Sequence, residues 1–357
     1  MRHLLRARHA LAAALAVFIA LALWPAAAAG HGRQVTVMTR NVFIGTDLGP
    51  VFAAQSFPEL VGATTTAFLE VQATRFPERA QALADEIAVA RPDVVGLQEA
   101  MLIRTDAPAD GAATPAEAVA WDYLEILLAA LADRGLDYEP AAVVVNADGP
   151  ELPTALGFDV RPTDRDVILV NRDRRPRVKV SNSQAANFAA RVTLPTFAGP
   201  VQLPRGWAAV DLKLRGQRFR VVNTHLEGFS AAVQVAQASE LLAGAAATTL
   251  PTLLIGDFNS RADGTGTPTY ALLRGAGFDD AWAALHPGDA GLTCCWETHL
   301  LSPVPPFDER IDFVLFRGRL RALAAEIVGE DPVADRTPSG LFHSDHAGVV
   351  ARLRLGR

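Results

Sequence analysis

The sequence predicts an α/β protein (α+β) in which two packed, mainly antiparallel β-sheets carry helices on their outer faces. Short apolar or alternating segments, which are typical of strands, recur along the chain. Some of them are joined as hairpins, and a few long segments with helical periodicity separate the others. The apolar fraction of 50% is ample for the core that such a fold requires.

The first half of the chain alternates strands with two predicted helices. Polar and apolar residues alternate in Gln34–Met38, which is also rich in valine, and this pattern predicts a strand. Arg75–Ala90 has apolar residues at helical spacing and ends before Pro92, and a second helix is expected over Ala116–Arg134, closed by Gly135. The other strands expected here are Asp93–Leu97, Tyr138–Val145, Ala155–Val160, Val167–Val170 and, on weaker patterns, Val178–Ser181 and Ala189–Leu194.

The second half begins with a predicted hairpin. Trp207–Leu214 and Arg218–Asn223 have strand patterns and flank Arg215-Gly216-Gln217, which is typical of a turn. Helices are expected over Ala231–Ala247 and Pro268–Gly275. The remaining predicted strands are Thr252–Ile255, Ile311–Phe316, Leu320–Val328 and Gly348–Leu355.

The first 29 residues have the pattern of a secretory signal peptide. Three arginines precede an apolar stretch over 11–24, and a run of small residues follows at 25–30. We therefore expect residues 1–29 to be removed and 30–357 to form one domain of an exported monomer, secreted or periplasmic. An uncleaved anchor is the less favoured alternative, because the stretch is shorter than the roughly 20 residues of a membrane span. No later segment is apolar enough to span a membrane.

The only two cysteines, Cys294 and Cys295, are adjacent. They have no distant partner, which excludes a disulfide framework, and they do not have the ligand spacing of a zinc site. Export would permit a vicinal disulfide between them.

Six segments share one pattern, in which an apolar strand is followed by polar residues at its end. These segments are 37–41, 94–99, 221–225, 254–259, 310–314 and 344–349. In chain order they supply Asn41, Glu99, His225, Asp257, Asn259, Asp312, Asp345 and His346. Each residue alone has an ordinary explanation. Asparagine and aspartate at strand ends commonly form turns, and a histidine can be buried in a core with its ring nitrogens hydrogen-bonded. The complete series is hard to explain by packing and points to a hydrolytic site that uses a divalent metal.

Gly256-Asp257-Phe258-Asn259 followed by Ser344-Asp345-His346, with Leu97-Gln98-Glu99 upstream, resembles the endonuclease/exonuclease/phosphatase superfamily of deoxyribonuclease I-like phosphoesterases. The similarity extends from about Gln34 to the C-terminus, and the first motif, Met38–Val42, is most similar to bacterial sphingomyelinases. The resemblance implies a four-layered α/β sandwich. It also implies a hydrolase that acts on phosphate esters with Mg²⁺, for which Mn²⁺ or Ca²⁺ are substitutes.

The resemblance also implies roles for individual residues. Glu99 is expected to be the principal metal carboxylate, with Asn41 beside the metal and Asp345 nearby. Asp257 is expected to orient or deprotonate the attacking water, and Asn259 to donate to the phosphate.

Three further residues complete the expected site. His346 is expected to bind the phosphate and stabilise the transition state, with Asp312 fixing its orientation. His225 is expected to contact the phosphate or the leaving group.

Two positions depart from the pattern of the exonuclease III-like repair nucleases, which are another branch of this superfamily. Phe43 stands where they carry an acidic residue, and Asp47 is the nearest acid. Their mid-chain tyrosine has no counterpart, and Arg165 is the nearest polar candidate for substrate binding.

The charge balance favours a lipid or small phosphoester over nucleic acid. Without residues 1–29, 30 basic residues face 39 acidic ones, a net charge of −9, which opposes general binding of polyanions. An exported nuclease is the alternative, and it would depend on the basic cluster Arg172, Arg174, Arg175, Arg177 and Lys179. A non-catalytic binding module is the third hypothesis, disfavoured because every motif is retained.

The proline-rich segment Leu300–Phe307 is apolar and precedes the strand of Asp312. We expect a rigid loop packed on the body of the protein. The alternative is a loop that enters a lipid surface or covers an alkyl chain.

Overall fold

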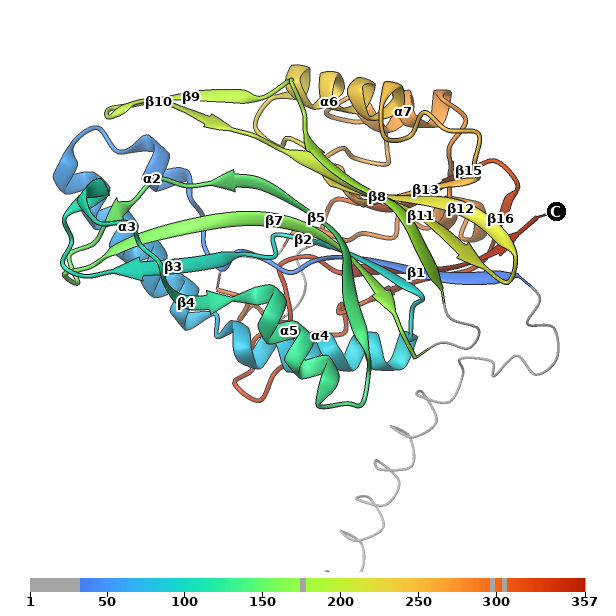
Figure 1. Cartoon of the computed structure of the whole chain (residues 1–357), viewed down its shortest axis with the longest axis horizontal. Helices are drawn as coiled ribbons and strands as arrows, with labels where there is room; N and C mark the ends of the chain where they lie inside the picture. Colours follow the sequence, from blue (N-terminus) through green and yellow to red (C-terminus); the bar gives the residue numbers. More distant parts are fainter. Residues whose placement is uncertain (1–32, 174–177, 296–298, 304–306, 357) are drawn as a thin grey trace, which may run out of the picture.

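The computed structural model describes residues 33–173, 178–295, 299–303 and 307–356, and these form four layers (Figure 1). Two β-sheets pack face to face. Helices α4 (Phe76–Ala90) and α5 (Tyr123–Ala132) cover the outer face of one sheet, and α6 (Ala231–Ala243) and α7 (Thr269–Gly275) cover the other. The expected α/β sandwich is confirmed. The predicted signal peptide lies outside the described residues.

The first sheet has nine described strands. Its main path is β16 (Leu320–Val328), β17 (Gly348–Leu355), β1 (Gln34–Asn41), β2 (Val94–Gln98), β7 (Asp159–Asn171), β3 (Leu102–Asp106) and β4 (Ala118–Asp122). Two more strands, β5 (Tyr138–Asp148) and β6 (Leu152–Pro153), also pair with β7. Only β1 and β2 run parallel among the described pairs of this sheet, so their carboxyl ends meet at one edge.

The second sheet has six described strands. Their order is β14 (Asp279–Asp280), β15 (Asp312–Arg317), β13 (Thr252–Asp257), β12 (Gln217–His225), β11 (Gly206–Leu214) and β8 (Lys179–Asn187). A separate hairpin is formed by β9 (Val192–Thr196) and β10 (Gly199–Leu203). The shorter helices are α2 (Gly49–Ala53), η1 (Gly111–Ala113) and α8 (Ala281–Leu285).

Alternate residues of the central strands face different layers, as the pleat of a strand requires. On β1, Val37 packs between the sheets, whereas Met38 packs against α4 and α5. On β13, Leu253 packs between the sheets, whereas Leu254 packs under α6 and α7. Both sheets are therefore apolar on both faces, which explains why these strands are continuous apolar runs in the sequence.

The helix predicted over Ala116–Arg134 is wrong in its first part. Residues 118–122 form β4, and α5 begins only at Tyr123. The carboxylate of Asp122 accepts hydrogen bonds from the amides of Leu124 and Glu125 at 3.1 and 3.3 Å. This N-cap fixes the start of the helix after the strand.

Other boundaries differ from the prediction, and some elements were missed. The strand expected at Ala155–Val160 begins only at Asp159, and the weak strand at Ala189–Leu194 begins at Val192. Helix α3 (Phe57–Ala73) and strands β3 and β10 were not predicted. The hairpin of β11 and β12 is confirmed, with Leu214 opposite Gln217.

Within the described residues, no helix combines the length and the apolar character needed to cross a membrane.

Candidate active site

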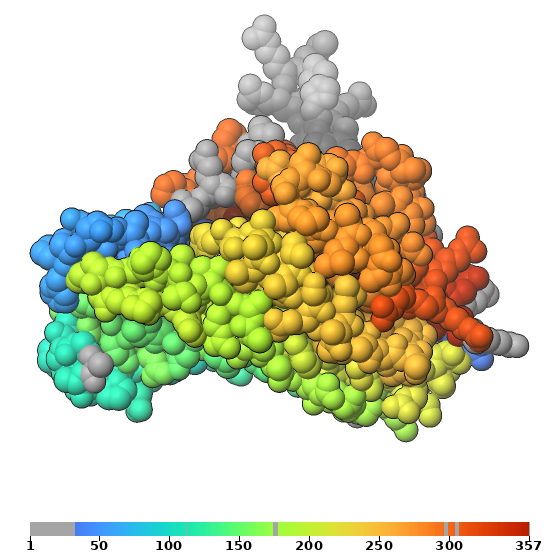
Figure 2. All heavy atoms as spheres, turned by 90° about the horizontal axis from the view of Figure 1, so that it is seen from above, coloured from blue at the N-terminus to red at the C-terminus, as the bar shows by residue number. Residues whose placement is uncertain are grey.

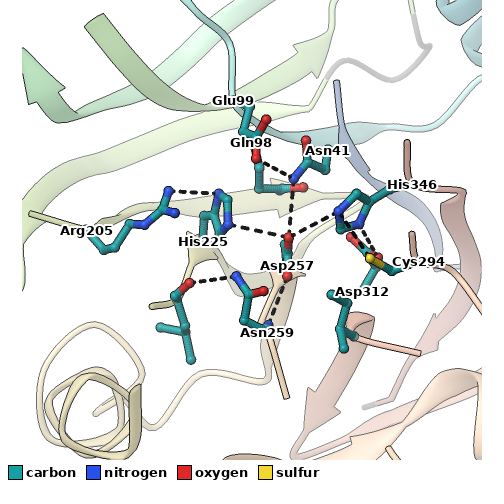
Figure 3. Close-up of polar contacts among 12 residues, drawn as sticks. Asn41, Gln98, Glu99, Arg205, His225, Asp257, Asn259, Cys294, Asp312 and His346 are labelled. Atoms are coloured by element: carbon teal, nitrogen blue, oxygen red, sulfur yellow. Dashed lines mark hydrogen bonds and ion pairs between the residues drawn. The ribbon is translucent and has the colours of Figure 1, made fainter. Parts of the chain in front are cut away.

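The polar strand ends meet at one edge of the sandwich. In the first sheet Asn41 pairs with Gln98, the residue before Glu99. In the second sheet Asp257 lies between His225 and Asp312 on the neighbouring strands. Figure 3 shows the side chains from both sheets converging on Asp257.

The amide of Asn41 joins the two sheets at this edge. Its Nδ2 lies 3.1 Å from Glu99 Oε1 and 3.2 Å from Asp257 Oδ2, so it donates to both carboxylates. Its Oδ1 accepts from the Phe43 amide at 2.9 Å, and the Ile44 amide donates to Glu99 Oε2 at 2.6 Å. The turn after β1 therefore orients both Asn41 and Glu99.

Asp257 is buried at the centre of the cluster. Its Oδ1 accepts from the Asn259 amide at 2.9 Å, and its Oδ2 faces His225 Nε2 at 3.4 Å and His346 Nε2 at 3.8 Å. Burial, and then the negative charge of Asp312, raise the pKa of Asp257 to about 6. Its carboxylate is therefore a base in the physiological range.

His346 and Asp312 form a buried ion pair. His346 Nδ1 lies 2.9 Å from Asp312 Oδ2. Burial lowers the pKa of His346, but Asp312, Asp345 and Asp257 outweigh it and hold this pKa well above its usual range. The imidazole is therefore protonated at neutral pH, and its Nε2–H faces Asp257 and the sulfur of Cys294, which is 3.6 Å away.

The second histidine has the opposite electrostatic environment. Arg205 Nη1 lies 3.1 Å from His225 Nδ1, and a guanidinium can only donate, so Nδ1 is the acceptor. Burial, and then the charge of Arg205, hold the pKa of His225 well below its usual range. His225 is therefore neutral with its proton on Nε2, directed at Asp257.

Glu99 and Asp345 are the partly exposed carboxylates of the cluster. Burial, followed by the charge of Asp164, raises the pKa of Glu99. Burial also raises the pKa of Asp345 to about 6, and the charge of Glu99 adds to this effect. Two neighbouring carboxylates that repel each other form a hard-oxygen donor set, which fits Mg²⁺, Mn²⁺ or Ca²⁺.

Two groups of three side chains place their ligand atoms within 4.8 Å of one another: Asp257, Asp312 and His346, and Cys294, Cys295 and His346. Each contains the protonated His346, whose charge opposes a cation. In the second group the two sulfurs are joined in a vicinal disulfide and are not thiolates. Glu99 and Asp345 fit a cation better than either group.

Two buried arginines hold the loops that carry the site. Arg79 donates to the carbonyls of Val42 and His343 at 2.7 and 2.9 Å, which ties the turn after β1 to the segment before β17. Arg40 pairs with Glu86 at 2.9 Å and donates to the His346 carbonyl. Arg40, which lies within the first motif, is therefore a structural group.

Arg165 has contacts different from those expected of a substrate-binding residue. Its three guanidinium nitrogens contact the carbonyls of Ala100 and Met101 and the carboxylate of Asp122. It secures the chain that follows Glu99. The adjacent residue on β7, Asp164, faces the site and pairs with Arg205 at 3.2 Å.

Sequence reasoning missed a set of charged residues beside Glu99. Arg205 interacts electrostatically with Asp164, Glu227, Glu99 and Asp166. Several carboxylate oxygens of this set are buried without a hydrogen-bond partner, including both oxygens of Asp166. Two of its members, Asp164 and Asp166, directly precede the apolar run 167–170 that predicts a core strand. Two acids next to such a strand were the feature of the sequence that could have indicated this set.

Backbone strain coincides with the candidate site. Glu99 and Asn259 have φ of 59° and 50°, in the left-handed region that few non-glycine residues adopt. Asn259 Nδ2 donates to the Leu226 carbonyl at 2.9 Å, which holds its amide beside the cluster. Such strain is typical of residues that are positioned for function.

Residues 61–346 match the Endonuclease/Exonuclease/phosphatase family. No curated protein matches the chain. Solved structures show the same fold. An endonuclease/exonuclease/phosphatase family protein from Bacteroides thetaiotaomicron has a TM-score of 0.56 at 15% identity, with 90% of this chain and 94% of that chain covered.

Two further solved structures are similar. One from Beutenbergia cavernae has a TM-score of 0.53 at 22% identity, covering 91% of this chain and 72% of that one. D. rerio TDP2, complexed with a single-strand DNA product, has a TM-score of 0.52 at 18% identity, covering 90% and 99%. The match over residues 61–346 shows that the chain belongs to the endonuclease/exonuclease/phosphatase family, whose members are hydrolases acting on phosphodiester bonds.

Proposed function

We propose that the protein is an exported, Mg²⁺-dependent phosphoesterase that hydrolyses a lipid or small phosphate ester by in-line attack of water. The observation that carries the proposal is the convergence of Asp257, the His346–Asp312 pair and Glu99 from both sheets at one edge. These groups provide a base, a protonated donor and a metal carboxylate within one site.

Each side chain has a role that its environment supports. Asp257, with a pKa of about 6, accepts a proton from the attacking water. The Nε2–H of neutral His225 holds the Asp257 carboxylate in place. Protonated His346 donates to a phosphate oxygen as charge develops on it, and Asp312 keeps the ring oriented. Asn259 offers the second N–H of its amide to the phosphate.

The metal would be held by Glu99 and Asp345, with Asn41 beside it. When bound, it would offset the negative charge that develops on the phosphoryl group. Mn²⁺ or Ca²⁺ would occupy the same oxygen donors.

The location of the basic cluster makes a duplex nuclease the weaker alternative. On β7, Val167 pairs with Leu97 near Glu99, whereas Val170 pairs with Val94 at the other end of β2. Arg172 follows β7 beyond that far end, and Lys179 begins β8 opposite Lys213, also far from the Gly206 end of β11. Arg174, Arg175 and Arg177 lie outside the described residues. The placed members of the cluster are therefore on the opposite edge from the site.

Hydrolysis assays on the purified chain without residues 1–29 test the proposal. Sphingomyelin, a phosphoinositide, plasmid DNA and a chromogenic phosphodiester would each be assayed with Mg²⁺ and with chelator. We expect Mg²⁺-dependent turnover of a lipid or small ester, and a 10²–10⁴-fold loss in Asp257→Asn, roughly the usual contribution of a general base.

Asp263→Asn is the matched control, because Asp263 is an exposed acid in the loop after the same motif. Its activity should equal that of the wild type. Full turnover in chelator, or near-normal activity of Asp257→Asn, would refute the proposal. Cleavage of plasmid alone would establish the nuclease alternative.

A further inference from the structure

A cavity of about 590 Å³ opens beside the candidate site. Its lining includes Glu99, Asp164 and Arg205, the residues that adjoin the catalytic cluster. The β9–β10 hairpin, α2 and the segment 147–152 also contribute to the lining. Figure 2 shows this hairpin, in yellow-green, lying against the blue segment that contains α2. The volume is within the range of roughly 300–1,000 Å³ that is usual for pockets that bind small ligands.

Most of the lining surface of the cavity is apolar. The hairpin contributes Phe197, Val201 and Leu203, and α2 contributes Val51 and Phe52. These side chains come from segments that are far apart in the sequence, so the apolar wall is a product of the fold.

Two exposed phenylalanines lie on this wall. Phe197, at the turn of the hairpin, is 41% exposed, and Phe229, after the strand of His225, is 65% exposed. Among the described residues the only other exposed phenylalanine is Phe57, which does not line the cavity. An apolar patch of this kind beside a reactive site is typical of ligand binding.

The charges of the cavity disfavour a long polyanion. Among the described residues that line it, Arg205 is the only basic one, and it is already shared between Asp164 and His225. The acidic lining residues that are described are Asp47, Glu99, Asp148, Glu151, Asp164 and Glu227. Two of them are paired, Asp148 with Arg104 and Arg161 and Asp164 with Arg205, and the other four form no ion pair with an arginine or lysine that the structure shows. A nucleic-acid strand that followed this wall would bring successive phosphates against carboxylates. A substrate with one phosphate and an apolar substituent meets no such repulsion.

We propose that this cavity binds an apolar substituent of the substrate, and that the preferred substrates are therefore phosphodiesters that carry an alkyl chain. This inference rests on the proposed function, because it assigns a substrate class to the same site. Phe197 and Phe229 are its specificity-determining residues.

A series of p-nitrophenyl alkyl phosphodiesters tests the inference, with methyl, butyl, hexyl and octyl chains below their micellar concentrations. The leaving group is constant, so differences in kcat/KM report on binding of the chain. Each methylene moved from water into an apolar site is worth a factor of about four. Because the cavity is partly open, we expect kcat/KM to rise by about 30-fold or more from methyl to hexyl.

The variants Phe197→Ser and Phe229→Ser should each reduce this ratio severalfold, because each removes apolar surface that contacts the alkyl chain. Phe57→Ser is the matched control, because it removes an exposed phenylalanine outside the cavity, and it should preserve the wild-type ratio. Thermal melting monitored by circular dichroism would confirm that all three variants are folded.

The outcomes separate the two proposals. No Mg²⁺-dependent hydrolysis of any ester would overturn the proposed function. Hydrolysis that does not depend on chain length, or a ratio that both cavity variants leave intact, would overturn the inference alone.

Discussion

At the scale of single residues, His346 lies between the carboxylates of Asp257 and Asp312, and this position makes its charge sensitive to mutation. In the mechanism proposed above, catalysis requires protonated His346 and ionised Asp257. Activity should therefore fall as the pH drops through about 6, where Asp257 is protonated, and fall again as the pH rises through the elevated pKa of His346.

The variant Asp312→Asn tests this arrangement. Removing the negative charge destabilises the imidazolium and lowers the pKa of His346, so the alkaline limb of the kcat/KM profile should move to lower pH. The expected displacement is about 1–2 pH units, the usual effect of a close opposite charge. Profiles between pH 5 and 10 at saturating Mg²⁺ measure it. Asp308→Asn, at an exposed nearby acid, is the control, and an unmoved alkaline limb in Asp312→Asn would contradict the role assigned to the pair.

The sequence motifs identified the residues that stand at strand ends, because each motif carries its own local signal. Asn41 and Asp257 end their strands as predicted. His346 and Asp312 do not follow a strand, because β17 begins at Gly348 and β15 begins at Asp312, but the structure brings all four residues together. Arg205 carries no such signal, because it lies between β10 and β11 and contacts His225 through the pairing of β11 with β12. Arg165 was selected as the polar residue nearest to the place of the missing tyrosine, yet its side chain faces the other side of β7 from Asp164. Which face a strand residue takes depends on register, which the sequence did not specify.

At the scale of elements, β13 reaches the site through Gly256. This residue has φ of +147°, and a Cβ built on it would lie 1.9 Å from the Thr224 carbonyl oxygen on β12. A side chain here would separate the two strands that carry Asp257 and His225.

We expect Gly256→Ala to lower the free energy of unfolding by about 3 kcal/mol or more, because backbone must move in a packed sheet. Gly264→Ala is the control. Gly264 also has a positive φ, of +80°, but no atom lies within 4 Å of the added methyl group, so the cost should be only about 1–2 kcal/mol. Urea denaturation of both variants gives the comparison, and equal losses would show that the contact with Thr224 has little effect.

The elements themselves were predictable where hydrophobic periodicity was strong. Helix α4 was found because Ala80, Leu83 and Ile87 repeat at helical spacing and are all buried. Helix α3 was missed because it buries only Thr64, Ala67 and Val71, a weak stripe, although Ser56 caps it by accepting from the Glu59 amide. Strand β4 was predicted as the first part of a helix, because its alanine-rich sequence has helical propensity. In the structure, pairing with β3 overrides that propensity.

The segment 300–307 was expected to be a loop packed on the body of the protein, and Leu300 agrees with this expectation. Leu300 is buried among Phe43, Leu341 and Phe342, whereas Leu301 is exposed. Pro305 and its two neighbours lie outside the described residues.

At the scale of the whole molecule, the site exists only if the two sheets keep their mutual register. Asn223 of the second sheet donates to the carbonyls of Leu97 and Val167 in the first, at 2.9 and 3.1 Å. It also accepts from Gln98 Nε2 at 2.6 Å. A Cβ on Gly96 would lie 2.5 Å from the Asn223 side chain, so the glycine makes room for this contact. Gln98 precedes Glu99, and Asn223 stands two residues before His225, so the contact aligns the two halves of the site.

The variant Asn223→Ala should therefore affect stability and catalysis together. It leaves a cavity and an unsatisfied buried amide on Gln98, and we expect a loss of about 2–4 kcal/mol in the free energy of unfolding. We also expect kcat to fall by about tenfold or more, because small displacements of reacting groups are costly. The control is Asn187→Ala, which removes an exposed amide bound only to the Val145 carbonyl and should cost less than about 1 kcal/mol without affecting kcat. Urea denaturation and steady-state kinetics measure both quantities, and an Asn223→Ala enzyme with wild-type kcat would show that packing of the apolar faces alone sets the register of the sheets.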